Sequence, residues 1–343
     1  MLDVDLEDTI NVKKNSSKKL NFRSASMLFS FIVILYVMLN EVLSFLADKG
    51  LINLNSIDED FYSSGIILQV IFQFLFILAP PIAFLIILKI DIKKSLKIKP
   101  VDFLNMILIF FIMCFSYPIM MMLNYGYLIT LKFLFGMEME QIVPLPEDLR
   151  QLILGLIVIG IFAGVFEEIL FRGVFLQGYR ELGAKWSIIL TGFLFGIFHF
   201  GIQRLLGTFL LGILIGFFVY RTGSLISGIF AHIVNNSITL VIVFLSRNNR
   251  TQEKELEEIM ATYQNGNNYM IIYTVIIILI VLVAIFGFVS LIYTFNLNTS
   301  KTYYHQVRRK LTNKEKLSFL WLLPGLLIIG SFFCSEIINA LNN

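Results

Sequence analysis

Long apolar stretches, separated by short polar segments, dominate the pattern of this chain. A helix needs about 20 apolar residues to cross the hydrocarbon core of a bilayer, and nine stretches are candidates for such spans. They are Met27–Leu46, Gly65–Leu88, Phe103–Leu123, Leu152–Leu176, Trp186–Phe200, Leu205–Tyr220, Leu225–Leu245, Tyr269–Phe295 and Leu317–Ile338. The fifth and sixth are short, so either could be re-entrant and the number of spans is eight or nine. The pattern predicts an all-α polytopic membrane protein built as a helix bundle.

The amino-acid composition supports the same class. Hydrophobic residues make up 57% of the chain and charged residues 15%, against about 45–50% and about 25% in soluble domains. This balance excludes a cytosolic globular enzyme, a disordered protein and a nucleic-acid binder, and it makes the lipid bilayer the first partner of the chain. The two cysteines, Cys114 and Cys334, lie far apart within apolar stretches and indicate neither a disulfide framework nor a metal knuckle.

The distribution of Lys and Arg predicts the orientation of the chain. When the segments between spans are assigned alternately to two sides, 19 of these residues fall on the side of the N-terminus and 7 on the other. Because Lys and Arg accumulate on the cytosolic side, we expect a cytosolic N-terminus and, with nine spans, an external C-terminus. The abundance of Phe, Ile, Asn and Lys is typical of an AT-rich bacterial genome, so the expected location is the plasma membrane of a bacterium.

The chain divides into four expected regions: a basic cytosolic tail at 1–26, three spans at 27–149, a core at 150–246, and an outer loop with two further spans at 247–343. The outer loop is acidic and is interpreted as a solvated face; its glutamates are Glu253, Glu255, Glu257 and Glu258. The last two spans carry few polar groups, so we expect them to face lipid. Residues 124–136 are too polar in places to assign to the third span.

Ionisable side chains are concentrated in the core. Inside a bilayer such groups are costly, and each one is a candidate for function. The core holds five of them: Glu167, Glu168, Arg172, His199 and His232. They include two of the three histidines of the chain, and the third, His305, lies in a basic segment and is expected at the surface.

Glu167 and Glu168 are adjacent but differ in their expected surroundings. Glu168 and Arg172 are four residues apart on one helix face, where a carboxylate and a guanidinium can pair. Glu167 is rotated by about 100° around the helix and lacks this partner, so it could serve as a general base in a poorly solvated cavity. The alternative is a purely structural Glu168–Arg172 pair, with Glu167 reaching toward the cytosolic interface.

The two core histidines occur in the next apolar stretches. His199 follows Phe195 at the end of one stretch, and His232 precedes Asn236 by one helical turn, so that the imidazole and the amide can point into one cavity. Each alone could be a hydrogen-bonded packing residue. Together with Glu167 they predict a single polar pocket within the membrane.

The expected depths of these residues are difficult to reconcile. At about 1.5 Å per residue, His199 lies roughly 20 Å from the start of its stretch, whereas Glu167 lies roughly 13 Å from the cytosolic end of its own. The fifth helix must therefore tilt, or begin inside the preceding loop, for the pocket to form.

These three elements, in this order, resemble the motifs of the CAAX protease and bacteriocin-processing family, also called CPBP or Abi. The family pattern is E-E-x-x-x-R, then F-x-x-x-H, then H-x-x-x-N. Here these positions hold Glu167, Glu168 and Arg172, then Phe195 and His199, then His232 and Asn236. The resemblance covers about residues 150–246.

The resemblance implies an intramembrane endopeptidase with an all-helical core and a cavity that opens toward the cytosol. Carried over by position, Glu167 would activate water with the help of His199, while His232 and Asn236 would stabilise the oxyanion. The Glu168–Arg172 pair would hold the site. The implied substrate is a peptide or a lipidated protein, in bacteriocin or signal-peptide maturation, immunity, or surface-protein processing.

Metal dependence is left open by the sequence. Glu167, His199 and His232 form an acceptable ligand set for a catalytic zinc ion, with Glu168 then acting as the base. The chain lacks the H-E-x-x-H spacing that favours zinc. We therefore expect no tightly bound metal, with zinc as the alternative.

Two other functions compete with proteolysis. The chain could be a non-catalytic scaffold or a bacteriocin-immunity factor that binds a membrane protein partner. It could also be a proton-coupled transporter that uses the same Glu and His side chains as a relay. A transporter needs a polar path across the membrane, and spans one to three show none.

Overall fold

The computed structural model describes residues 20–50, 62, 65–138, 146–246, 268–300 and 311–342. These ranges consist of helices and their connections, and no strand occurs in them. Most of the N-terminal tail, the acidic loop around Glu253 and Glu258, and His305 lie outside the described residues, so what the sequence predicts for them stays a prediction.

The helices follow the predicted spans closely. In chain order they are α2 (Phe22–Asp48), α4 (Ile66–Phe72), η2 (Gln73–Leu78), α5 (Ala79–Ile87), α6 (Ile92–Leu96), α7 (Phe103–Phe135), α8 (Leu149–Gly155), η3 (Leu156–Phe162), α9 (Ala163–Glu168), η4 (Ile169–Phe175), α10 (Leu176–Gly178), η5 (Arg180–Leu182), α11 (Ala184–Ile197), α12 (Ile202–Thr222), α13 (Leu225–Leu245), α15 (Asn268–Asn298), α16 (Asn313–Leu317), η7 (Ser318–Leu322) and α17 (Leu323–Asn342). Within the described ranges, eight continuous helical stretches are long and apolar enough to cross a membrane. The expected class, a polytopic all-α membrane protein, is confirmed.

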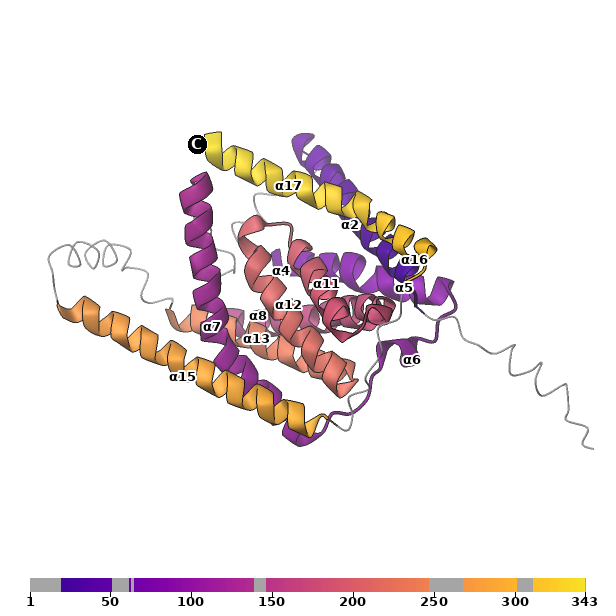
Figure 1. Cartoon of the computed structure of the whole chain (residues 1–343). Coiled ribbons are helices and arrows are strands. Elements are labelled where there is room, and N and C mark those ends of the chain that lie inside the picture. The colour runs from indigo at the N-terminus through magenta and orange to yellow at the C-terminus, as the bar shows by residue number, and fades with distance from the viewer. Residues whose placement is uncertain are drawn as a thin grey trace, which may run out of the picture.

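The predicted fifth span is the exception. Its helix, α11, has only 14 residues and is therefore about 21 Å long, short of the roughly 30 Å of a hydrocarbon core. It forms a hairpin with α12, which follows after a short turn (Figure 1). The two helices approach closely at Gly192 and Gly212, where a Cβ atom on Gly212 would lie 2.8 Å from the Cα atom of Gly192. Of the two short stretches, only α11 falls below the length of a hydrocarbon core, whereas α12 is long enough to cross.

The third span is longer than its hydrophobic pattern suggested. Helix α7 continues through residues 124–135 and ends at Gly136, whose φ of 72° is readily adopted by glycine. The polar residues of this extension find partners on the α11–α12 hairpin: the Asn124 Oδ1 atom accepts a hydrogen bond from the backbone N–H of Gly207 at 3.1 Å, and the Tyr127 hydroxyl donates to the carbonyl of Ile202 at 2.8 Å. The helix therefore extends beyond Leu123 because its polar groups are satisfied inside the bundle.

Two sets of polar contacts mark the two ends of the bundle. At one end, which we call the basic end, the backbone N–H of Leu225 donates to the carbonyl of Lys97 at 3.2 Å, and the Arg221 Nε atom donates to Thr299 Oγ1 at 2.9 Å. At the other, the hairpin end, the backbone N–H of Ile202 donates to Glu336 Oε2 at 2.8 Å. Lys97 and Arg221 both belong to the Lys and Arg set predicted to be cytosolic. The two residues lie at the same end of the bundle, as the alternate assignment of the segments to two sides requires. Which end faces the cytosol stays a prediction.

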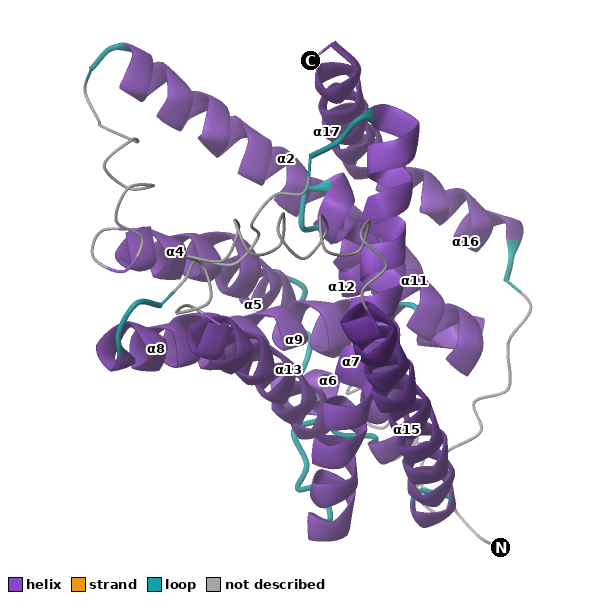
Figure 2. Ribbon diagram, turned by 90° about the vertical axis from the view of Figure 1, so that its left-hand side faces the viewer, coloured by secondary structure: helices purple, strands orange, loops and turns teal. Residues whose placement is uncertain are grey.

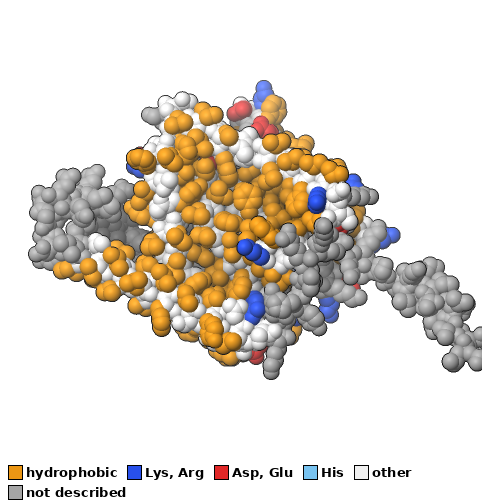
Figure 3. Space-filling view, in the orientation of Figure 1, with side chains coloured by type: hydrophobic (Ala, Val, Ile, Leu, Met, Phe, Trp, Pro, Cys, Tyr) orange, Lys and Arg blue, Asp and Glu red, His pale blue; other side chains and the backbone are white. Residues whose placement is uncertain are grey.

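The outer helices present apolar side chains to their surroundings. Helix α15 packs along α7, and α17 packs along α2 (Figure 1). Only 11% of the most apolar 18-residue stretch of α15 is buried inside the protein. Hydrophobic side chains cover most of the face drawn in Figure 3, as a surface in contact with lipid requires. Helix α13 packs against both α8 and α9, which belong to one continuous helical stretch, and α8 and α13 lie on the left in Figure 2.

Candidate active site

The helix that carries the two glutamates is irregular on both sides of them. Helix α9 lies between two π-helical segments, η3 and η4. Such wide turns are rare and occur frequently at functional sites. In η3, the carbonyl oxygen of Ile159 accepts a hydrogen bond from Asn236 Nδ2 at 2.8 Å. This bond ties the irregular helix to α13.

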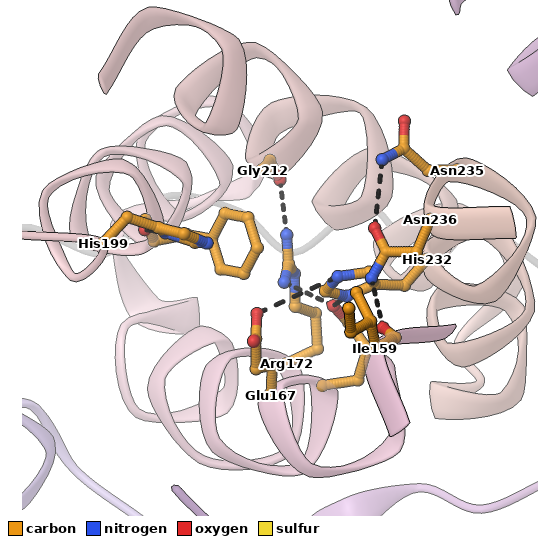
Figure 4. A network of polar contacts seen from close by, with 10 residues as sticks. Ile159, Glu167, Arg172, His199, Gly212, His232, Asn235 and Asn236 are labelled. Carbon is orange, nitrogen blue, oxygen red and sulfur yellow. Dashed lines mark hydrogen bonds and ion pairs between the residues drawn. The ribbon is translucent and has the colours of Figure 1, made fainter. Parts of the chain in front are cut away.

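Glu168 is the centre of a buried network, and its partners Arg172 and His232 are labelled in Figure 4. Its Oε1 atom accepts hydrogen bonds from Arg172 Nη1 at 2.6 Å and from His232 Nδ1 at 2.9 Å. The side chains of Glu168 and Arg172 are both 0% exposed. Arg172 Nη2 also donates to the carbonyl of Gly212 at 2.9 Å, which connects the network to the α11–α12 hairpin. The pairing expected from the spacing of Glu168 and Arg172 is confirmed.

This network determines which ring nitrogen of His232 carries the proton. A carboxylate can only accept hydrogen bonds, so the contact with Glu168 assigns the proton to Nδ1 of the imidazole. In the neutral ring, Nε2 is then an acceptor, and this atom lies 3.9 Å from Glu167 Oε2. His232 therefore holds Glu168 with one nitrogen and faces Glu167 with the other.

Glu167 faces a cavity and not the surface of the bundle. Its side chain is 14% exposed and lines a cavity of about 600 Å³ together with His199, His232 and Asn236. This placement excludes the alternative in which Glu167 reaches away toward the interface. The candidates from three separate helices thus share one cavity, while their chemical roles stay predictions.

His199 belongs to this cavity but lies apart from the Glu167–His232 contact. It lies two residues beyond Ile197, the last residue of α11, and its Nδ1 atom is 2.9 Å from the carbonyl oxygen of Phe195. Because a carbonyl only accepts, Nδ1 carries the proton and Nε2 is left as an acceptor. Among the described side chains, Glu167 contacts His232 at 3.9 Å, and no such contact joins it to His199. His199 nevertheless lines the same cavity as Glu167 and His232.

The cavity extends toward the hairpin end of the bundle. Beyond Glu167 its lining continues through Ala163 and Ile159, and beyond His232 it continues through Asn236 to Leu240. In both helices these residues lie on the hairpin-end side of the site, since α8 begins and α13 ends there. With the orientation predicted from Lys and Arg, the hairpin end is external. This direction is opposite to the cytosolic opening that the resemblance implies.

The described residues do not form a metal site. No group of three or more His, Cys, Asp or Glu side chains in the described ranges is arranged to hold a metal ion. His199, one of the three possible zinc ligands, is separated from the Glu167–His232 contact. In this arrangement Glu167, His199 and His232 do not fit together as ligands of one zinc ion.

Several cavity residues were missed by the sequence reasoning. Asn235 lines the cavity next to Asn236 and donates a hydrogen bond to its Oδ1 atom at 3.2 Å. Gln69 and Gln73 of the second span and Asn124 of the third also line it. The prediction that spans one to three show no polar path across the membrane did not take these amides into account. The signal in the sequence that could have identified them is that amide side chains occur within otherwise apolar stretches.

A comparison with known families identifies a family for the segment that holds the candidate residues. Residues 149–238 match the family model described as type II CAAX prenyl endopeptidase Rce1-like. Over this segment the chain is similar to the Rce1-like family. The match confirms the family resemblance expected from the motifs, and it covers all six candidate residues, from Glu167 to Asn236. By its description this is a family of endopeptidases, so the segment indicates a protein hydrolase.

The Rce1-like segment corresponds to helices α8 to α13. The first three spans and the last two lie outside it. Neither a curated protein nor a solved structure matches the chain.

Proposed function

We propose that this protein is an intramembrane endopeptidase that hydrolyses a peptide bond with a water molecule activated by Glu167. The observation that carries the proposal is the contact between Glu167 and His232, 3.9 Å apart at the wall of a polar cavity. The neighbouring Glu168 is already neutralised by Arg172. Of the two carboxylates, Glu167 is the one with access to a reactant.

The geometry supports a specific position for the water. A separation of 3.9 Å between Glu167 Oε2 and His232 Nε2 allows one water molecule to donate a hydrogen bond to each, at about 2.8 Å. The water oxygen then directs a lone pair into the cavity. Glu167 accepts the proton as the water attacks the carbonyl carbon, and it returns this proton to the leaving amine when the C–N bond breaks.

The amide side chains of α13 supply donors for the oxyanion. Asn236 uses one N–H to bind Ile159, which leaves its second N–H for the developing negative charge. His232 is an acceptor at Nε2 in its neutral state, so it takes part as an oxyanion donor only after receiving a second proton. We assign His232 to positioning water, and Asn236 to the oxyanion. Glu168 and Arg172 hold His232 in place.

The proposed substrate is a peptide or a lipidated protein of the bacterial plasma membrane. The description of the matched family names a CAAX prenyl endopeptidase, and a prenyl group is a lipid. A cavity bounded by membrane helices accommodates such a chain. The processing of a bacteriocin, a peptide signal or a surface protein, or immunity to a bacteriocin, provides substrates of this chemistry.

Substrate trapping in the native host tests the proposal. Glu167→Gln keeps the shape of the side chain but removes the base, so the variant should accumulate uncut substrate, recovered with the protein and identified by mass spectrometry. Glu41→Gln is the matched control, because Glu41 is exposed on α2, and it should behave as wild type. A Glu167→Gln strain with normal protein level and an unchanged set of cleaved membrane peptides would contradict the proposal.

A further inference from the structure

Gln73 is a cavity residue from outside the Rce1-like segment. It is the first residue of η2, a π-helical segment of the second span. This segment packs against α9, the helix of Glu167. The side chain of Gln73 lines the same cavity as Glu167 and His199.

The amide of Gln73 is buried without a partner for its oxygen. The residue is 3% exposed, and its Oε1 atom accepts no hydrogen bond from any residue that the structure describes. Nearly all buried polar atoms in folded proteins are hydrogen-bonded, so an exception requires an explanation. At this position an apolar side chain would serve stability better than a glutamine, which indicates that the amide has another use.

The surroundings of Gln73 indicate the kind of ligand. Gln69 lies one helical turn away and also lines the cavity, as do Asn235 and Asn236 on the opposite helix α13. A carboxamide offers one acceptor and two donors, which complement the N–H and C=O of a peptide group. The two ends of the amide exchange places when it rotates by 180°, so either can be turned toward a ligand.

We propose that Gln73 binds the backbone of the substrate, pairing its amide with one peptide group and so holding the scissile bond beside Glu167. This inference rests on the proposed hydrolytic function. It assigns substrate binding to the second span, which the family match does not include. Gln73 is a binding residue, and its loss should weaken binding without changing the chemistry at Glu167.

The test uses Gln73→Met, which keeps the length of the side chain and removes the amide. The full-length protein in lipid nanodiscs is given a library of random-sequence decapeptides, and cleavage is followed by mass spectrometry. We expect kcat/KM to fall about tenfold, as for the loss of one hydrogen bond, through a higher KM. The thermal midpoint Tm should stay the same or rise, because an unpartnered buried oxygen is removed.

Gln151→Met is the matched control. The Gln151 Oε1 atom accepts a hydrogen bond from the backbone N–H of Glu147 at 2.7 Å, at the start of α8 and outside the cavity lining. This substitution removes a satisfied amide, so it should lower Tm or leave it unchanged, with KM unaltered. KM therefore distinguishes the two variants, because it should rise for Gln73→Met and stay unchanged for Gln151→Met.

Backbone N-methylation locates the contact. In a peptide that the wild-type protein cleaves, one methylated position should lower kcat/KM about tenfold for wild type and leave it unchanged for Gln73→Met. If Gln73→Met lowers Tm and leaves KM unchanged, Gln73 is structural, through a bound water for example, and the inference is overturned.

A binding measurement separates this inference from the proposed function. The dissociation constant Kd of the library peptide retained most strongly by Glu167→Gln is compared with its Kd for Glu167→Gln combined with Gln73→Met. An increase of about tenfold supports the binding role even if wild type cuts no peptide, in which case hydrolysis alone fails. Cleavage by wild type with no effect of Gln73→Met overturns the binding role alone. A protein that neither binds nor cuts the library overturns both.

Discussion

Two consecutive glutamates acquire different surroundings from a single helix. Glu168 is fully buried and shares its Oε1 atom between Arg172 and His232, whereas Glu167 lies at the wall of the cavity. A buried carboxylate is stable only when it is paired, and this one is. The network around Glu168 therefore serves to hold His232, and the acid–base chemistry falls to Glu167.

Stability measurements should distinguish these two glutamates. Arg172→Met leaves Glu168 buried without its cation, and removing one partner of a buried ion pair typically costs about 3–5 kcal/mol. Glu167→Gln breaks no such pair and should change the free energy of unfolding by less than about 1 kcal/mol. Denaturation of the two variants in detergent is the measurement, and equal losses of stability would contradict the division of roles.

The dependence of the peptidase activity on a metal ion can be tested by chelation. Because the described donors do not gather around one point, we expect the peptidase activity to survive exhaustive chelation. The activity of purified protein before and after chelation, with added zinc as the second arm, is the measurement. Complete loss of activity with rescue by zinc would show that Glu167, His199 and His232 do act as ligands.

Residue-level prediction from the sequence succeeds where spacing along one helix is sufficient. The pairing of Glu168 with Arg172 follows from their separation of four residues. The hydrogen bond from Arg172 to the Gly212 carbonyl and the place of Gln73 in the cavity depend on how separate helices pack. No local pattern in the chain contains that information.

Among the elements, the α11–α12 hairpin combines close packing with a direct contact to the site. Gly212 approaches Gly192 on the neighbouring helix, and its carbonyl accepts a hydrogen bond from Arg172. Small residues at helix contacts allow such an approach in membranes. Separating the two helices should therefore disturb the buried ion pair as well.

Gly212→Ala tests this coupling. The new Cβ atom would lie 2.8 Å from the Gly192 Cα atom, and backbone cannot move aside as a side chain can. We expect a loss of about 1–3 kcal/mol in unfolding free energy and a lower rate of peptide cleavage. Gly126→Ala in α7 is the control, because nothing lies within 4 Å of its added Cβ, and it should be neutral or stabilising. Equal behaviour of the two variants would contradict the coupling.

The elements themselves were largely predictable, because apolar length determines which segments can span a bilayer. Two features were not. The extension of α7 depends on the contacts of Asn124 and Tyr127 with the hairpin. The π-helical turns on both sides of α9 change the backbone geometry but leave the apolar pattern of the sequence unchanged, so the pattern does not reveal them.

At the level of the whole molecule, the direction of the cavity and the orientation of the chain belong together. The cavity runs from Glu167 toward the hairpin end. Composition alone is enough to predict a membrane protein, and the Lys and Arg distribution predicts which end is cytosolic. The direction of the cavity relative to those ends is a property of helix packing, which only the structure supplies.

Thiol labelling determines this orientation. In a variant without Cys114 and Cys334, a single cysteine is placed at Glu138 near the hairpin end or at Ser300 at the basic end, both of which are exposed. A membrane-impermeant maleimide added to intact cells should label Glu138→Cys and not Ser300→Cys. The reverse result would overturn the predicted orientation and make the cavity open toward the cytosol.

The most direct test of the account is hydrolysis by purified protein in ¹⁸O-labelled water. The substrate trapped by Glu167→Gln is added to wild-type protein in lipid nanodiscs, and the products are analysed by mass spectrometry. We predict one labelled oxygen in the new C-terminal carboxylate and a rate about 10²- to 10⁴-fold lower for Glu167→Gln, with Glu41→Gln unchanged. A Glu167→Gln protein that cuts at the wild-type rate would contradict the central claim.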